Sequence, residues 1–245
     1  MTENIKDALE YAVELNNQSE KIIKDQYGNE WYDFKRHDMT QLIPQRDYPK
    51  PLELSTLGSL VEYYTNNLDG IQKKQAIIVV EDADLVTVYT QRDDREVRSK
   101  LLVVKAELPR IRFDEFMSSE KFNIMLQSQF VNRADRELLL DYISKISIEN
   151  GADIEDDGAS QVTVIKNGVA SKTKGKAPNP VTLAPYRTFA EVEQVESEFV
   201  FRINTNAQMA LFEADGGRWK LEAKKRVHKY LTEALKKFVN LTILA

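Results

Sequence analysis

A chain of 245 residues is long enough for one large domain or two small ones. Its formal net charge of −5 argues against a protein that coats nucleic acid through its overall field, although a local basic groove stays compatible with it. The absence of cysteine excludes disulfides, zinc sites built on cysteine and thiol catalysis. The chain has neither a signal-peptide pattern nor an apolar run of the about 20 residues that cross a bilayer, so we expect a cytoplasmic protein without membrane contact.

The predicted elements begin with an amphipathic helix over residues 3–23. Its apolar face consists of Ile5, Leu9, Ala12, Val13 and Leu15. The aromatic and irregular segment 25–50 predicts one or two short strands. A second helix is predicted over 55–68, with Ser55 as its N-cap.

Three strands follow by pattern, at 76–81, 85–90 and 97–108, and the short turns between them predict an antiparallel meander. Two helices are predicted next, near 119–130 and over about 133–148. The buried side of the second helix is expected to consist of Leu138, Leu139, Tyr142, Ile143 and Ile146.

Residues 161–172 predict a hairpin with a tight turn at Asn167-Gly168, and 171–180 predict a basic polar loop. Three further strands are expected near 181–189, 198–204 and 208–214. A basic helix lies within 218–238 by its apolar spacing.

The start of this basic helix is ambiguous, because residues 218–222 also alternate like a strand. We favour a start near residue 223, followed by a closing strand at 239–245. The mixture of patterns predicts an α+β fold with a mostly antiparallel sheet, packed helices and an N-terminal helical segment. We expect residues 1–50 to form the N-terminal helix and an irregular aromatic segment, and 51–245 a single α+β domain.

A dense set of polar side chains lies among core residues between Pro180 and Trp219. Polar groups beside buried strands pair with each other or with a ligand. The predicted ligand- or partner-binding residues are Arg187, Glu191, Glu193, Gln194, Glu196, Arg202, Asp215, Arg218, Trp219 and Lys220. If this stretch is extended, Arg187 shares a strand face with Glu191 and Glu193 and can pair with them. A purely structural network of ion pairs is the alternative.

Other clusters have weaker signals. The carboxylates Glu191, Glu193, Glu213 and Asp215 suit a metal-dependent hydrolase or nuclease, but no nucleophile with its base accompanies them. We therefore assign no catalytic residue, no metal ligand and no cofactor.

Two turns contain groups that can bind a ligand. The turn from Asp215 to Arg218 contains two glycines and would suit a phosphate at a helix start, with an ordinary tight turn as the alternative. The acidic residues Asp153, Glu155, Asp156 and Asp157 lack the calcium-loop spacing and predict a solvated turn.

The basic helix is a candidate surface for single-stranded nucleic acid. Lys224, Lys225 and Lys229 are its predicted contacts. The supporting cations and aromatic residues are Lys172, Lys174, Lys176, Tyr186, Trp219 and Tyr230. Bases stack on aromatic rings while cations hold the backbone. A solvated helix face is the alternative.

Five blocks in order resemble an uncharacterised phage and prophage family, the domain-of-unknown-function group that includes the YfdQ-type prophage proteins. They are TLGSLVEYYTNN (56–67), EFMSSEKFNIMLQSQF (115–130), DDGASQ (156–161), PNPVTLAPYRTFAEVEQVESEFVFR (178–202) and ALFEADGGRWKLEA (210–223). Val195 departs from the pattern, which has proline there. The resemblance implies a phage or prophage origin and a role inside the infected bacterium. It implies no established activity and no catalytic residue.

The sequence is compatible with three functions. The first is a non-enzymatic binding protein that antagonises a host defence component or sequesters its ligand in the host cytoplasm. The second is an accessory factor that binds single-stranded nucleic acid in phage replication or recombination. The third is a metal-dependent hydrolase or nuclease. The closing strand and other strand edges also suit a homo-oligomer.

Overall fold

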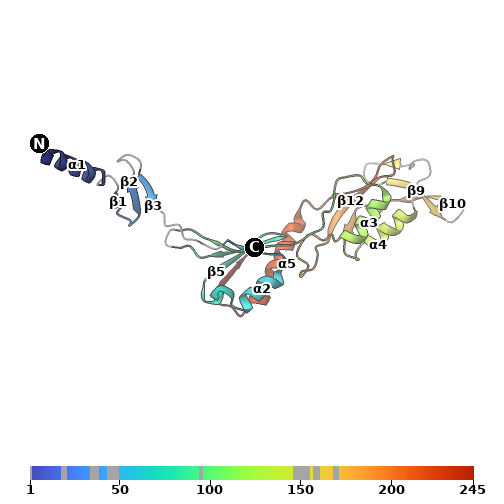
Figure 1. Ribbon diagram of the computed structural model, residues 1–245. Helices are drawn as coiled ribbons and strands as arrows, with labels where there is room; N and C mark the ends of the chain where they lie inside the picture. The colour runs from blue at the N-terminus through green and yellow to red at the C-terminus, as the bar shows by residue number, and fades with distance from the viewer. Residues whose placement is uncertain are drawn as a thin grey trace. The chain divides into compact units, whose positions relative to one another are not determined.

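The computed structural model describes residues 2–17, 21–33, 39–42, 50–93, 96–145, 155–156, 161–167 and 171–245. The chain divides into two compact units, Met1–Tyr48 and Pro49–Ala245, and several of their helices and strands are labelled in Figure 1. Helices combine with a mixed five-stranded sheet and smaller antiparallel sheets, which confirms the predicted α+β class. None of the described helices is long and apolar enough to cross a membrane.

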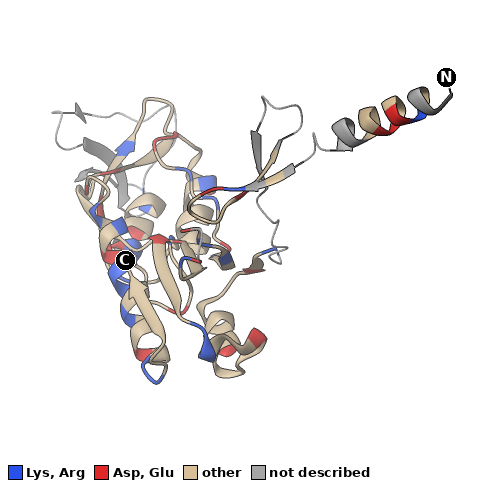
Figure 2. Cartoon of the chain, turned by 90° about the vertical axis from the view of Figure 1, so that its left-hand side faces the viewer, with Lys and Arg blue, Asp and Glu red and all other residues tan. Residues whose placement is uncertain are grey.

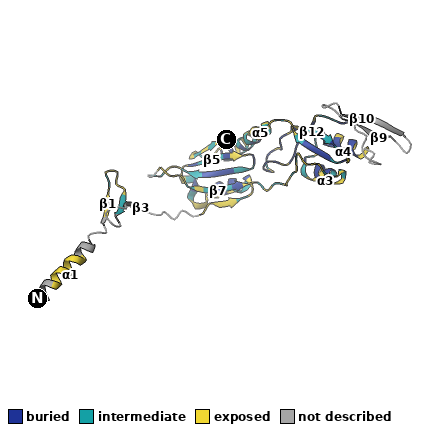
Figure 3. Ribbon diagram, turned by 90° about the horizontal axis from the view of Figure 1, so that it is seen from above, coloured by how far each residue is buried: buried dark blue, intermediate teal, exposed yellow. Residues whose placement is uncertain are grey.

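The first unit contains helix α1 (Thr2–Asn17) and the antiparallel strands β1 (Lys21–Lys24), β2 (Glu30–Asp33) and β3 (Met39–Leu42). The predicted helix over 3–23 is thus too long. Its last residues form β1 instead, because Ile22 and Ile23 pair with Tyr32 and Trp31, and β-branched side chains favour strands. The apolar side chains on α1 that the structure describes are exposed, as Figure 3 shows in yellow.

The second unit contains a five-stranded sheet in the order β14-β5-β6-β7-β4. Its strands are β4 (Leu52–Leu54), β5 (Ala76–Asp82), β6 (Leu85–Thr90), β7 (Lys100–Lys105) and β14 (Leu241–Leu244). The central meander β5-β6-β7 is antiparallel, as predicted, whereas both edge strands pair in parallel.

Three helices cover one face of this sheet and close the first hydrophobic core. They are α2 (Leu57–Thr65), the 3-10 helix η1 (Leu68–Lys73) and α5 (Arg218–Leu235). Leu60 and Tyr64 from α2 meet Val227 and Leu231 from α5 above Ile78 of β5, and all five side chains are buried. Thr56, and not Ser55, caps α2, because its hydroxyl accepts the N–H of Ser59 at 3.1 Å.

A second core lies under the antiparallel strands β11 (Val181–Leu183), β12 (Ser197–Ile203) and β13 (Met209–Glu213). Helices α3 (Ser119–Gln129) and α4 (Arg136–Lys145) cover it, and the rings of Phe122 and Phe201 lie 5.5 Å apart. Leu138, predicted to be buried, is 53% exposed because α4 turns Leu139 inward.

The remaining strands form a small antiparallel sheet of β8 (Glu155–Asp156), β9 (Gln161–Asn167) and β10 (Ser171–Lys176). The prediction of a loop over 171–180 is wrong for its first six residues, which are β10. Backbone pairing with β9 satisfies the hydrogen bonds of this polar segment without an apolar face of its own.

Helix α5 begins at Arg218, not near residue 223. The carboxylate of Asp215 accepts the N–H groups of Gly217 at 3.0 Å and Trp219 at 3.2 Å, and so fixes the first turn. The strand predicted near 181–189 also ends early, at Leu183. The residues after it form the segment from which the candidate site is built.

Candidate functional site

The loop 184–196 connects β11 to β12 and contains most of the predicted site. It folds around the buried amide of Gln194. The Gln194 side-chain oxygen accepts the N–H groups of Arg187 at 2.9 Å and Thr188 at 3.2 Å. Its nitrogen donates to the carbonyls of Thr188 at 3.3 Å and Phe189 at 3.1 Å. The backbone thus pairs with Gln194 and not with a neighbouring strand, so the stretch is not an extended strand and the strand face that extension would have given to Arg187, Glu191 and Glu193 does not form.

Arg187 lies at the centre of a second set of contacts. Its guanidinium donates to the carboxylate of Glu213 and to the hydroxyl of Ser197. Its Cζ lies 3.8 Å from the centre of the Trp219 ring. Burial lowers the pKa of Arg187 to about 10, against the opposing effect of the carboxylates of Glu213 and Asp215. Arg187 thus pairs with Glu213 and not with Glu191 or Glu193.

Two of the predicted carboxylates hold helix N-termini. Glu191 accepts the N–H of Gly58 in the first turn of α2 at 3.0 Å. Asp215 does the same for α5, as described above. Carboxylates stabilise helix starts because they accept free N–H groups and oppose the positive end of the helix dipole. The backbone donors of Gly217 and Trp219, considered for a phosphate, are therefore occupied by Asp215.

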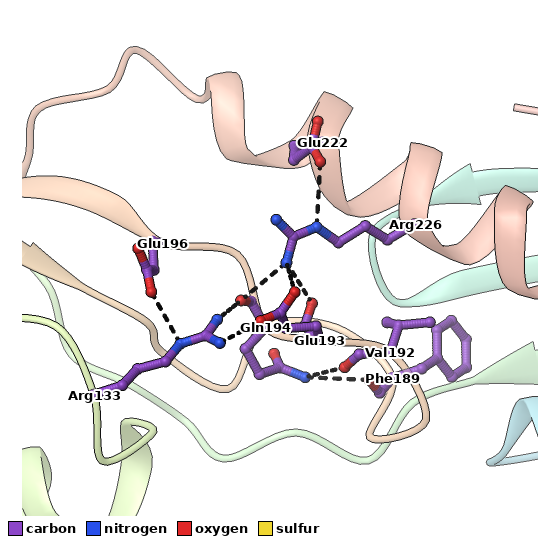
Figure 4. A network of polar contacts seen from close by, with 8 residues as sticks. All are labelled: Arg133, Phe189, Val192, Glu193, Gln194, Glu196, Glu222 and Arg226. Atoms are coloured by element: carbon purple, nitrogen blue, oxygen red, sulfur yellow. Dashed lines mark hydrogen bonds and ion pairs between the residues drawn. The ribbon is translucent and has the colours of Figure 1, made fainter.

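A third set joins Glu193 and Glu196 to two arginines from distant elements (Figure 4). Arg133, in the connection between α3 and α4, contacts Glu193 at 2.5 Å and Glu196 at 3.1 Å. Arg226 of α5 contacts Glu193 at 3.3 Å and donates to the Gln194 carbonyl at 3.3 Å. The pKa of Glu193 is lowered by the hydrogen bond from Arg133 and by the two positive charges. Arg133 was not predicted, and no local pattern in the sequence marks it.

The structure does not bring every predicted residue to this cluster. Arg202 lies on the face of β12 opposite Ser197, and Arg218 is exposed at the start of α5. Lys220 is exposed as well, but its Nζ lies 5.8 Å from the centre of the Trp219 ring. On α5, Lys225 and Lys229 are exposed, and Figure 2 shows the basic residues along this helix in blue.

Other parts of the predicted nucleic-acid surface are less accessible. Lys224 is partly buried, and Arg187 stacks on Trp219. The described part of the chain does not include the side chains of Lys172, Lys174 and Lys176. In the acidic turn it likewise leaves out residues Asp153 and Asp157 and the side chains of Glu155 and Asp156.

Two pockets open beside the 184–196 loop and share the side chains of Leu108, Pro109 and Tyr186. One, of about 280 Å³, reaches Asp82, Asp84, Phe113, Arg187, Trp219 and Lys220. The other, of about 330 Å³, reaches Thr56, Glu107, Thr188, Glu191 and Gln194. Tyr186 is 39% exposed between them. We call this region the Tyr186 surface, made of Asp82, Asp84, Glu107, Leu108, Pro109, Tyr186 and Glu191.

The carboxylates considered for a metal are divided among these separate contacts. Within the described residues, no three His, Asp or Glu side chains come together in a group that would hold a metal ion. No protein-family model, curated protein or solved structure matches this chain. The resemblance to YfdQ-type prophage proteins stays an expectation from the sequence blocks.

Proposed function

We propose that this chain is a phage- or prophage-encoded, non-enzymatic binding protein that acts in the host cytoplasm by occupying a host defence protein. One observation carries the proposal. The charged groups of the cluster at Arg187, Glu191, Glu193 and Asp215 are engaged in holding the chain together, while the pockets at Tyr186 stay open beside them. A rigid loop that presents an open surface suits recognition better than proton transfer, which needs an acid or base free to act.

The chemistry of the Tyr186 surface indicates the kind of partner. It combines the carboxylates of Asp82, Asp84 and Glu107 with Leu108, Pro109 and a partly exposed tyrosine, while Glu191 accepts the N–H of Gly58 and Lys220 lies in one of the two pockets. Tyrosine is a frequent anchor at the centre of protein interfaces, and acidic surroundings speed encounter with a basic partner. The proposed partner is therefore a host protein with a basic rim around an apolar recess.

The test compares Tyr186→Ala with Tyr27→Ala, which removes an exposed tyrosine from the first unit. Tagged wild type and both variants are purified under gentle conditions from the bacterial host. We expect a stoichiometric host protein with wild type and Tyr27→Ala, and about tenfold weaker retention by Tyr186→Ala, as for an interface anchor. The absence of any such partner, or equal retention by both variants, would contradict the proposal.

The alternative is binding of single-stranded nucleic acid by α5. The exposed pair Lys225 and Lys229, one helical turn apart, favours it. The stacking of Arg187 on Trp219 weighs against it, because that ring face is unavailable to a base. This alternative requires that Lys225→Gln with Lys229→Gln weakens salt-sensitive binding to an oligonucleotide and lowers its salt dependence.

A further inference from the structure

A third pocket lies beside α3 and next to the Tyr186 surface, since Arg110 follows Pro109 in the chain and the carbonyl of Gln129 accepts the N–H of Tyr186 at 3.0 Å. Its volume is about 480 Å³. The lining residues that matter for its chemistry are Arg110, Arg112, Glu115, Phe116, Lys121 and Gln129. None of these residues belongs to the cluster around Arg187. We call it the α3 pocket.

The backbone on one side of the α3 pocket is held in place by β13. The N–H of Asp114 donates to the carbonyl of Leu211 at 2.9 Å. Met117 and Met209 exchange two backbone hydrogen bonds of 2.9 and 2.8 Å. The pocket wall is therefore fixed to a strand of the second core and is formed before any ligand arrives.

The charge of the α3 pocket is positive, although the whole chain is acidic. Arg110 and Lys121 form no ion pair with any carboxylate in the part of the chain that the structure describes. Arg112 has only a 3.6 Å contact with Glu115, and both side chains are more than 60% exposed. Such surface pairs are weak and easily exchanged for another anion. Three cations thus face one pocket that contains a single carboxylate.

Two further features distinguish this pocket from a solvated basic patch. Phe116 and Ile124 expose 42% and 59% of their surfaces beside the cations, which gives the pocket an apolar side. The side-chain oxygen of Gln129 is buried and has no hydrogen-bond partner within the described residues. Buried polar atoms are usually satisfied, so this oxygen is a candidate acceptor for a ligand N–H once the side chain adjusts.

We propose that the α3 pocket binds a phosphate ester that carries a nucleobase. Arg110, Arg112 and Lys121 hold the phosphate by charge-assisted hydrogen bonds, and Phe116 offers a surface for the base. The same chemistry occurs in a free nucleotide and in a single strand, and the experiment separates these two sources. The site does not depend on the proposed function, because it shares no residue with the Tyr186 surface.

The test uses ATP and a fluorescein-labelled oligothymidine as probes, titrated into the full chain at low salt. The site variant is Arg110→Gln with Lys121→Gln, two exposed residues whose replacement leaves both cores intact. The matched control, Lys73→Gln with Lys74→Gln, removes the same charge from two exposed residues at the end of η1 that belong to none of the proposed sites. We expect the site variant to weaken binding of at least one probe by about tenfold or more, and the control by less than about twofold.

If ATP binds and the oligonucleotide binds no more tightly than ATP, the ligand is a free nucleotide. Binding of the oligonucleotide much more tightly than ATP identifies a single strand. Thermal unfolding of the site variant near the wild-type temperature shows that any loss comes from the pocket and not from unfolding. Failure of both probes to bind wild type, or a loss as large in the Lys73→Gln with Lys74→Gln control as in the site variant, overturns the proposal.

Discussion

The guanidinium of Arg187 stacks on the indole of Trp219, with its Cζ 3.8 Å from the ring centre. Arg187 belongs to the 184–196 loop, whereas Trp219 belongs to the first turn of α5 and packs with Ala83, Val195 and Ala223. The same arginine reaches Glu213 at the end of β13. One side chain therefore ties the second core, the loop and α5 together, which makes it a structural residue at the border of the proposed binding surface.

Replacement of Arg187 by alanine should destabilise the second unit by about 2–4 kcal/mol, because it removes a buried cation from its carboxylate, its hydroxyl partner and its aromatic ring. Urea unfolding followed by tryptophan fluorescence measures the change. The matched control is Arg92→Ala, which breaks an ion pair that is 60% and 75% exposed. It should cost less than about 0.5 kcal/mol. Equal losses of unfolding free energy in the two variants would show that the buried contacts of Arg187 stabilise the unit no more than an exposed ion pair does.

The change Gln194→Leu keeps the volume of the side chain but removes its amide. The N–H groups of Arg187 and Thr188 and the carbonyl of Phe189 then lose their partner inside the loop. We expect a loss of about 2–4 kcal/mol and faster hydrogen exchange over 187–194. Gln127→Leu on the exposed side of α3 is the control. An unchanged exchange rate in the loop would contradict the role given to Gln194.

Asp215→Ala should shorten α5 from its start, because Gly217 and Trp219 lose their acceptor. The expected loss is about 1–2 kcal/mol, and Asp215→Asn, which keeps one acceptor oxygen, should lose less. Circular dichroism and urea unfolding report both. A phosphate at this turn would need the same N–H groups that Asp215 accepts. If phosphate bound wild type and Asp215→Ala equally well, Asp215 would not occupy these groups and the capping assignment would be wrong.

In the first unit, Asp25 offers a test by pH. Its carboxylate accepts the side-chain N–H of Asn29 at 2.9 Å, the indole N–H of Trp31 at 3.1 Å and two backbone N–H groups. These hydrogen bonds, that of the Asn29 side chain first, lower the pKa of Asp25 to about 2. Because the pKa of Asp25 is lower in the folded state than the value of about 3.9 in the unfolded state, the ionised carboxylate stabilises the turn when the pH is above about 3.9. This stabilisation disappears as the pH falls toward 2.

The carboxyl carbon shift of Asp25, followed by NMR from pH 7 to 1.5, should therefore have its midpoint near 2. The indole N–H resonance of Trp31 should move with the same midpoint. A midpoint near 4 for Asp25 would mean that the turn is not held in this way.

Periodicity predicted the elements whose hydrogen bonds are local or lie between neighbouring strands. The meander at 76–90 and helices α2, α3 and α4 were found within a few residues because their apolar spacing is regular. Residues 184–189 were misassigned to the strand predicted near 181–189, whereas their backbone partner in the structure is the Gln194 side chain. The start of α5 depends on Asp215, three residues ahead of the helix.

The density of polar residues in the sequence marked the stretch whose side chains pair in the structure, but it did not predict which residues pair. Gln194, Arg187 and Trp219 do come together. The partners of Glu193, however, are Arg133 and Arg226, 60 and 33 residues away, and single-sequence patterns contain no signal for such pairs. The Tyr186 surface likewise includes Asp82 and Glu107, which only the fold brings beside the loop.

The central claim, that the Tyr186 surface binds a host protein, is tested most directly by placing a photo-crosslinking phenylalanine analogue at position 186 in cells of the host. The same analogue at position 27, in the first unit, is the control. The account predicts one dominant crosslinked host protein at position 186 and none of that protein at position 27. Irradiation that yields no crosslinked host protein at position 186, or the same proteins at both positions, would contradict it.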